Sequence, residues 1–215
     1  MFFSPDIIMN IICILSGIGL FFQIKPPLYI KLLPIFLLLT FTVEGISNYL
    51  TEHKIANIPL YNFYSVLEIG FYLFVLKEIM QSRKIRKIIR NLIWIYPLIA
   101  LVNILFLQKI GHFHSMTYSL GCLLIVFMSI YYFYELFQIK QSVNLIREPS
   151  FWICTGLLFF YSCTFPLFGL VNFLIGAPRF IDQNLYYILM IMNVLLYSLF
   201  TIAILCRTNI RKSML

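Results

Sequence analysis

Charged residues are scarce in this sequence. Only 11% of its 215 residues are Asp, Glu, Lys or Arg and 61% are hydrophobic, a composition far from that of soluble domains. No segment between the apolar runs is long enough to fold as a soluble domain. No basic surface interleaved with aromatic residues is left outside these runs, so the net charge of +8 does not indicate a nucleic-acid-binding protein. We therefore expect a single membrane domain over residues 1–215.

Motifs of common enzyme classes are absent as well. There is no HExxH zinc motif, no GxSxG nucleophile motif and no glycine-rich phosphate loop. The predicted spans contain no histidine to bind an intramembrane zinc ion, and the last span contains no lysine for a retinal Schiff base. The five cysteines form no CxxC pair and fall within predicted spans, which indicates buried thiols and no disulfide framework. These absences argue against an enzyme and lead us to expect no cofactor.

Long apolar runs, by contrast, recur along the whole chain. They predict an all-α membrane protein, a bundle of seven transmembrane helices. The predicted spans are residues 7–23, 29–50, 60–80, 92–107, 117–137, 151–174 and 184–206. The first run has no basic segment ahead of it, so we expect it to be retained as a span and not cleaved as a signal peptide.

Basic residues are distributed unevenly between the two sides of this bundle. Of the 16 Lys and Arg, 13 fall on the side that carries the connector between the third and fourth spans. The positive-inside rule places that side in the cytoplasm, with the amino terminus outside and the carboxyl terminus inside. We expect the connector to contact anionic lipid, or a cytoplasmic or membrane signalling partner. Its basic residues are Arg83, Lys84, Arg86, Lys87 and Arg90.

Three short matches keep the same order in the two halves of the chain. The sequence FQIK at 22–25 recurs at 137–140, and the Gly45–Asn48 spacing recurs as Gly169–Asn172. Tyr61 and Glu68 are matched by Tyr186 and Asn193. The matches indicate a 3+1+3 parallel repeat of the kind found in some transporters. Chance similarity within Phe-, Ile- and Leu-rich segments is the alternative.

Two glutamates lie inside apolar segments. At about 1.5 Å per residue, Glu44 is roughly 9 Å from Leu50, at the end of the second span, and Glu68 roughly 10 Å from Tyr61, near the start of the third. A charged side chain in hydrocarbon costs at least ~2.5–3.5 kcal/mol, so such residues usually face the bundle interior and serve a function. We predict a polar pocket in the outer half of the bundle that binds a proton, an ion or a small ligand. The predicted pocket residues are Glu44, Asn48, Tyr61, Tyr64, Glu68, Asn172 and Asn193. Contacts between helices are the alternative role for the asparagines.

All three histidines fall in the predicted outer loops. His53, His112 and His114 share these loops with Glu52 and Asp182, a combination that can bind zinc or respond to external pH. Histidines in loops are more often simply solvated. A metal site therefore remains a secondary hypothesis.

Three stretches carry a resemblance to known proteins: LYNFYSVLE at 60–68, REPSFWICTGLLFFYS at 147–162 and NVLLYSLFTIA at 193–203. Together they resemble a group of small, uncharacterised seven-span membrane proteins common in Bacteroidota. The resemblance covers most of the chain and implies the seven-span architecture and residence in the bacterial inner membrane. It brings no activity with it.

The combined pattern favours a non-enzymatic sensor or signalling accessory. A ligand, ion or proton would bind at Glu44 and Glu68, and the response would reach the cytoplasm through the basic connector. A small permease or proton-coupled transporter is the alternative, and an integral membrane enzyme acting on lipid is a weaker one. The sequence leaves the oligomeric state open.

Overall fold

The described parts of the apolar runs form helices, because a helix satisfies its own backbone hydrogen bonds. The computed structural model describes residues 5–18, 26–108, 111–138, 144–170 and 179–212, and these residues contain no strand. The helices are α1 (Pro5–Ile18), α2 (Leu28–Glu52), α3 (Ile58–Ile79), α4 (Arg83–Val102), α5 (Ser115–Gln138), α6 (Pro149–Leu170) and α7 (Arg179–Lys212). Helix α4 continues as one π-helical segment, Asn103–Leu107, and a short 3-10 turn, Leu145–Arg147, precedes α6.

Six of these helices are long and apolar enough to cross a membrane. They fall in Leu28–Glu52, Ile58–Ile79, Arg83–Leu107, Ser115–Gln138, Pro149–Gly169 and Asn184–Cys206. Six such helices packed together indicate a multi-pass integral membrane protein. Helix α1 has 14 described residues, and the rest of the first predicted span, 19–23, lies outside the described residues. The end of the sixth predicted span, 171–174, lies outside them too.

Helix α4 begins earlier than the hydropathy pattern predicts. The expected span starts at residue 92, whereas the helix starts at Arg83, so the basic connector forms its first turns. Arg and Lys are good helix formers, and hydropathy alone cannot distinguish a polar helical turn from a loop. The basic residues are therefore held on a rigid helix.

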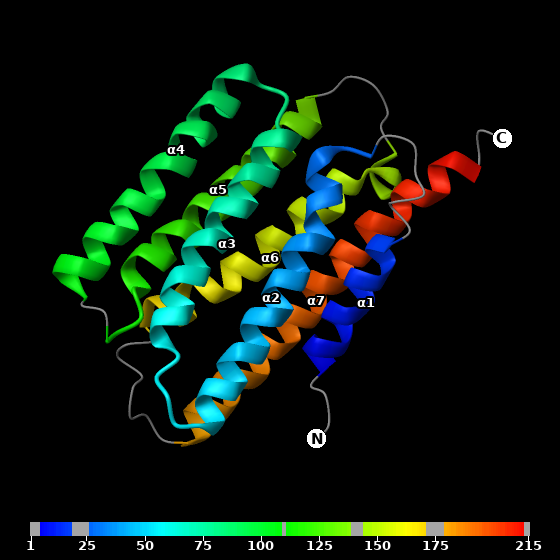
Figure 1. Cartoon of the computed structure of the whole chain (residues 1–215). Coiled ribbons are helices and arrows are strands. Elements are labelled where there is room, and N and C mark those ends of the chain that lie inside the picture. Colours follow the sequence, from blue (N-terminus) through cyan, green and yellow to red (C-terminus); the bar gives the residue numbers. More distant parts are fainter. Residues whose placement is uncertain (1–4, 19–25, 109–110, 139–143, 171–178, 213–215) are drawn as a thin grey trace.

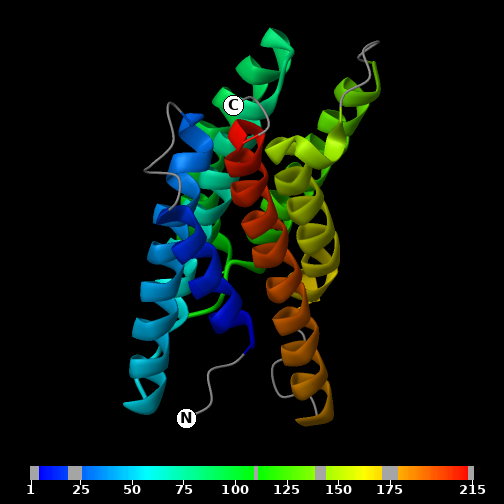
Figure 2. The same ribbon diagram turned by 90° about the vertical axis from the view of Figure 1, so that its right-hand side faces the viewer.

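Six helices form a closed ring, and the seventh lies outside it. Helix α1 packs against α2 and α7, α2 against α3, α3 against α5, α5 against α6, and α6 against α7. Figure 2 shows α1 between α2 and α7. Helix α4 packs against the outer sides of α3 and α5. Successive helices run in opposite directions (Figure 1), so each end of the bundle carries alternate connections. We call the end where α2 ends and α3 begins the lower end, and the opposite end the upper end.

The interior near the upper end is filled by apolar side chains. Leu33 and Leu37 of α2, Leu73 and Leu76 of α3, and Phe200 and Ile204 of α7 are all fully buried. The outer faces are apolar too: Trp94 and Phe106 are 76% and 77% exposed. Soluble proteins rarely expose continuous apolar surface of this kind, whereas a bilayer solvates it.

Candidate functional site

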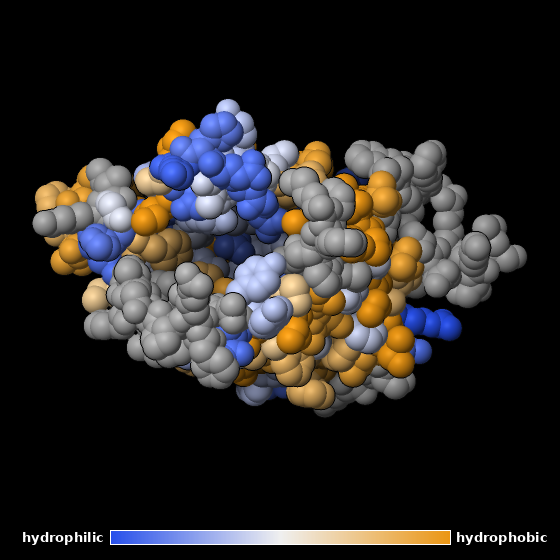
Figure 3. All heavy atoms as spheres, turned by 90° about the horizontal axis from the view of Figure 1, so that it is seen from below, coloured by the Kyte–Doolittle hydropathy of each residue, from blue (hydrophilic) through white to orange (hydrophobic). Residues whose placement is uncertain are grey.

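A cavity of about 460 Å³ lies inside the ring on the side of the lower end. Residues of α2, α3, α5, α6 and α7 line it, together with Phe113 from the connection before α5. Seen from below, the molecule is hollowed beside a group of hydrophilic residues (Figure 3). Five helices that are distant in sequence thus contribute to one site.

Glu68 projects into this cavity from α3, and two tyrosines hold its carboxyl group. The hydroxyl group of Tyr161, on α6, donates to Oε1 at 3.0 Å, and that of Tyr118, on α5, donates to Oε2 at 3.3 Å. Both tyrosines are almost completely buried. Each carboxyl oxygen therefore has one fixed donor, and its remaining lone pairs are available to the cavity.

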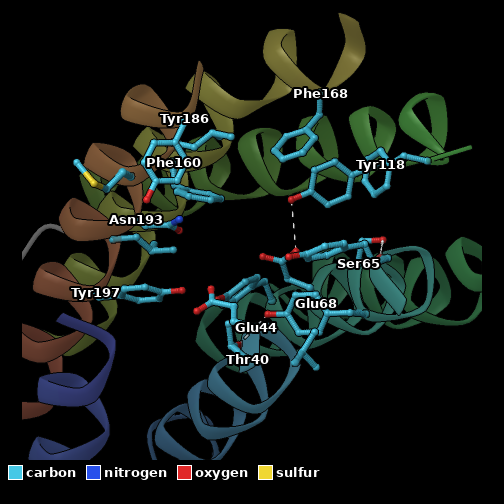
Figure 4. A pocket seen from close by; sticks show the side chains of 18 of the residues that line it. Thr40, Glu44, Ser65, Glu68, Tyr118, Phe160, Phe168, Tyr186, Asn193 and Tyr197 are labelled. Atoms are coloured by element: carbon cyan, nitrogen blue, oxygen red, sulfur yellow. Dashed lines mark hydrogen bonds between the residues drawn. The ribbon is translucent and has the colours of Figure 1, made fainter. Parts of the chain in front are cut away.

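Glu44 faces the same cavity from α2. Figure 4 shows its side chain turned into the cavity, with Tyr197 and Asn193 of α7 on the opposite wall. One turn earlier, the hydroxyl groups of Thr40 and Tyr64 are hydrogen-bonded at 2.7 Å and join α2 to α3. The two acids thus reach the same cavity from neighbouring helices.

Aromatic rings form the wall between α5 and α6. The ring of Tyr118 lies 4.8 Å from that of Phe168 and 5.5 Å from that of Phe113, measured between centroids and in edge-to-face arrangements. Such pairs stabilise beyond the area that they bury. These ring contacts position the Tyr118 hydroxyl group beside Glu68.

The cavity is closed toward the upper end. On α2, the residues that follow Thr40 in that direction are the fully buried Leu37 and Leu33. On α3, Leu73 and Leu76 succeed the cavity residue Tyr72, and on α7 Phe200 succeeds Tyr197. A layer of fully buried apolar side chains thus lies between the acids and the upper end.

Most of the predicted pocket residues line the cavity. Glu44, Tyr61, Tyr64, Glu68 and Asn193 do so. Asn48 is exposed on α2 and is not among the lining residues, although it was expected to share the pocket. Its position one turn after Glu44 places it beyond the cavity wall. Asn172 lies outside the described residues.

The sequence analysis did not identify the two donors to Glu68. Tyr118 and Tyr161 lie in spans whose periodicity carries no polar signal beyond Tyr itself, which is abundant in this chain. Only the packing of α5 against α3 and α6 brings them to the carboxyl group. The fully buried Asn10 of α1 was also missed. Neither polar atom of its side chain has a hydrogen-bond partner among the described residues.

The histidines occupy three different environments. The His53 ring contacts the carbonyl oxygen of Tyr49 at 2.9 Å, and His112 is exposed. His114 is completely buried instead of solvated, because it packs against α3 just before α5 begins. The described residues contain no group of three or more His, Cys, Asp or Glu that could hold a metal ion.

His114 lies close to a serine of the cavity but is not placed as a general base. Its Nε2 is 2.7 Å from Ser65 Oγ and 3.1 Å from the carbonyl oxygen of Asn62. Since a carbonyl oxygen only accepts, the tautomer that satisfies both contacts carries hydrogen on Nε2. Ser65 Oγ in turn donates to the carbonyl oxygen of Tyr61 at 2.7 Å. The pair therefore lacks the arrangement that activates a serine nucleophile. Burial lowers the pKa of the His114 ring.

The basic connector is attached to both neighbouring helices at the upper end. Glu135 of α5 accepts hydrogen bonds from the backbone N–H groups of Gln81 at 2.9 Å and Ser82 at 3.0 Å. The guanidinium group of Arg86 donates to the carbonyl oxygens of Lys77 and Glu78, where α3 ends. All five basic side chains are exposed at the surface, and that of Arg86 is in addition hydrogen-bonded to the end of α3.

No protein family, curated protein sequence or solved structure matches this chain. What the cavity does must therefore be inferred from its own geometry and chemistry.

Proposed function

We propose that the chain is a seven-span protein of the bacterial inner membrane, with its amino terminus outside and its carboxyl terminus in the cytoplasm. The common direction of α1 and α7 supports an odd number of spans (Figure 1). The exposed basic residues of α4 lie at the upper end, which supports a cytoplasmic position for that end. The cavity would then open toward the outside.

We further propose that the protein is a non-enzymatic sensor that binds a small ligand, ion or proton in this cavity. The observation that carries the proposal is a cavity that holds Glu44 and Glu68 and is closed on the other side by apolar residues. Placing two carboxyl groups within a membrane costs more free energy than a contact between helices requires. Both groups also lie where a ligand could reach them. A channel needs a continuous open path, whereas fully buried apolar residues such as Leu37, Leu73 and Phe200 lie between the cavity and the upper end.

Helix α5 offers a route for the response. Near its lower end Tyr118 donates to Glu68, and near its upper end Glu135 holds the start of α4. These residues are 17 positions apart, which corresponds to roughly 26 Å of helix. A ligand that displaces Tyr118 would move α5 and with it the exposed basic side chains that face anionic lipid or a cytoplasmic partner.

A small permease or proton-coupled transporter is the second candidate, and one observation favours it. In the ring, α1, α2 and α3 are followed by α5, α6 and α7, with α4 outside. This order is what a 3+1+3 repeat around a twofold axis along the membrane normal requires. The matched pairs Tyr61 with Tyr186, and Glu68 with Asn193, all line the cavity. In a transporter, the apolar layer would open in a second conformation.

Cysteine accessibility distinguishes the two candidates. In a chain whose five cysteines are replaced by alanine, Asn193→Cys would probe the cavity. The matched controls are Ala56→Cys at the lower end and Gln81→Cys at the upper end, both exposed. Each variant would be treated with a membrane-impermeant charged maleimide in spheroplasts and in inverted vesicles.

For a sensor, Asn193→Cys reacts only from the side on which Ala56→Cys reacts. Reaction from both sides would support the transporter and overturn the sensor proposal. Protection from both sides, with both controls reactive, would overturn the idea that the cavity receives ligands from outside.

A further inference from the structure

We infer that the cavity ligand is an organic cation with an apolar body, such as an aryl-alkyl amine. The inference rests on the proposed ligand-binding function and specifies the chemical class that the site would accept. It follows from the charge of the lining, from its aromatic rings and from the size of the cavity.

The charge of the lining has one sign. Glu44 and Glu68 are the acids, and the described lining residues include no Lys, Arg or His. Among the described residues, the hydrogen-bonding partners of Glu68 are neutral tyrosines, which orient its carboxyl group without neutralising it. Glu68 is half-buried, and a charge withdrawn from water is normally paired, so a ligand ammonium group is the complement that this carboxylate provides for. A ligand anion would be repelled by the same two groups.

Aromatic faces surround the acids. Tyr64 and Tyr72 of α3 and Tyr197 of α7 line the cavity beside them. A cation over an aromatic ring is attracted by the negative face of the ring, and the attraction grows as water is removed. Carboxyl groups together with tyrosines form the environment that favours an alkylammonium group over a neutral hydroxyl group of the same size.

The remainder of the cavity suits an apolar body. Phe113, Phe168, Leu189 and Met190 line it, and its volume of about 460 Å³ far exceeds that of an ammonium group alone. Small-molecule sites typically measure about 300–1,000 Å³. A bare metal ion is a poorer fit, because hard cations need about six or more oxygen ligands and the described residues include no suitable cluster.

A matched ligand series tests the inference. The probes are 4-phenylbutan-1-amine, 4-phenylbutan-1-ol and 4-phenylbutanoate at pH 8, where the amine is cationic and the acid is anionic. Binding to the purified full-length protein in an uncharged detergent would be measured by isothermal titration calorimetry, with protein-free micelles as the blank. We expect the amine to bind more tightly than the alcohol, and the acid to bind least.

Substitutions connect the preference to the two acids. Glu68→Gln and Glu44→Gln are each expected to weaken binding of the amine about 10- to 100-fold, the loss of a charge-assisted contact. The matched control is Glu52→Gln, an exposed carboxyl group at the same end that does not line the cavity, and it should leave binding unchanged. Asn193→Asp adds a carboxyl group to the wall and should tighten binding of the amine, a gain that a misfolded protein cannot produce.

Two results would overturn the inference. Equal binding of amine and alcohol, unaffected by either Gln substitution, would leave a ligand cavity but remove its cation preference. Tightest binding of the acid would reverse the sign of the preference. Neither result depends on the cysteine-accessibility experiment, so the cation inference and the sensor proposal can fail separately.

Discussion

Glu135 provides the sharpest test of the link between α5 and the basic connector. Its two carboxyl oxygens accept hydrogen bonds from the backbone N–H groups of Gln81 and Ser82, which precede the first turn of α4. A hydrogen bond to a charged group contributes about 1.5–3 kcal/mol when buried, whereas capping carboxylates near solvent contribute about 0.5–2 kcal/mol. Because this site is only partly buried, we expect Glu135→Ala to cost about 1–2 kcal/mol of local stability.

That cost predicts a measurable change in proteolysis. An opening free energy lowered by about 1–2 kcal/mol raises the opened population of the first α4 turn about 5- to 30-fold. Trypsin cleaves after Arg83 and Lys84 in that turn, and its rate follows the opened population when opening is fast relative to cleavage. The rate of cleavage by limited trypsin digestion should therefore rise by the same factor.

The control and the refuting result follow from the geometry. Glu135→Gln keeps one acceptor oxygen and should give an intermediate rate. Glu148→Ala removes an exposed carboxyl group near the same end and should leave the rate unchanged. If Glu135→Ala is cleaved at the wild-type rate and its melting temperature is unchanged, the two hydrogen bonds do not hold the connector. That result would refute the proposed route through α5.

Three further predictions concern packing, pH and the site. Burial lowers the pKa of His114, so as the pH decreases the unfolded chain binds a proton at a higher pH than the folded protein does. The melting temperature should therefore decrease as the pH is lowered from about 6.5, and it should decrease less in His114→Gln. A Cβ atom at Gly121 would lie 2.8 Å from the Tyr96 hydroxyl oxygen, so Gly121→Leu should cost about 1–3 kcal/mol or more, which thermal unfolding would measure. Tyr161→Phe removes the 3.0 Å hydrogen bond to Glu68 and should shift the infrared carboxyl band that Glu68→Gln abolishes; an unshifted band would contradict the geometry.

The sequence located the helices well because membrane helices are encoded locally. A long apolar run must satisfy its backbone within itself, so its type and approximate ends follow from composition alone. The start of a helix is less certain than the start of its apolar part. Helix α4 starts at Arg83, ahead of the apolar span predicted from Leu92, because basic residues extend a helix without adding to its hydropathy.

The candidate site was predicted in part for a similar reason. Counting residues along two adjacent antiparallel helices predicted that Glu44 and Glu68 would share a pocket, and both line the cavity. The burial of His114 could not be anticipated, because it depends on a connection that folds back onto Asn62 and Ser65 of α3. A loop position in the sequence does not reveal such contacts.

The sequence by itself thus determined a membrane protein, its helices and the two acids on which the proposed site is based. Only the tertiary structure decided that α4 lies outside the ring and that α3 meets α5 directly. That arrangement brings Tyr118 and Tyr161 to Glu68 and encloses the cavity. The reason is physical: helix formation depends on neighbours along the chain, whereas the order of helices in a ring depends on side-chain packing between segments far apart in sequence.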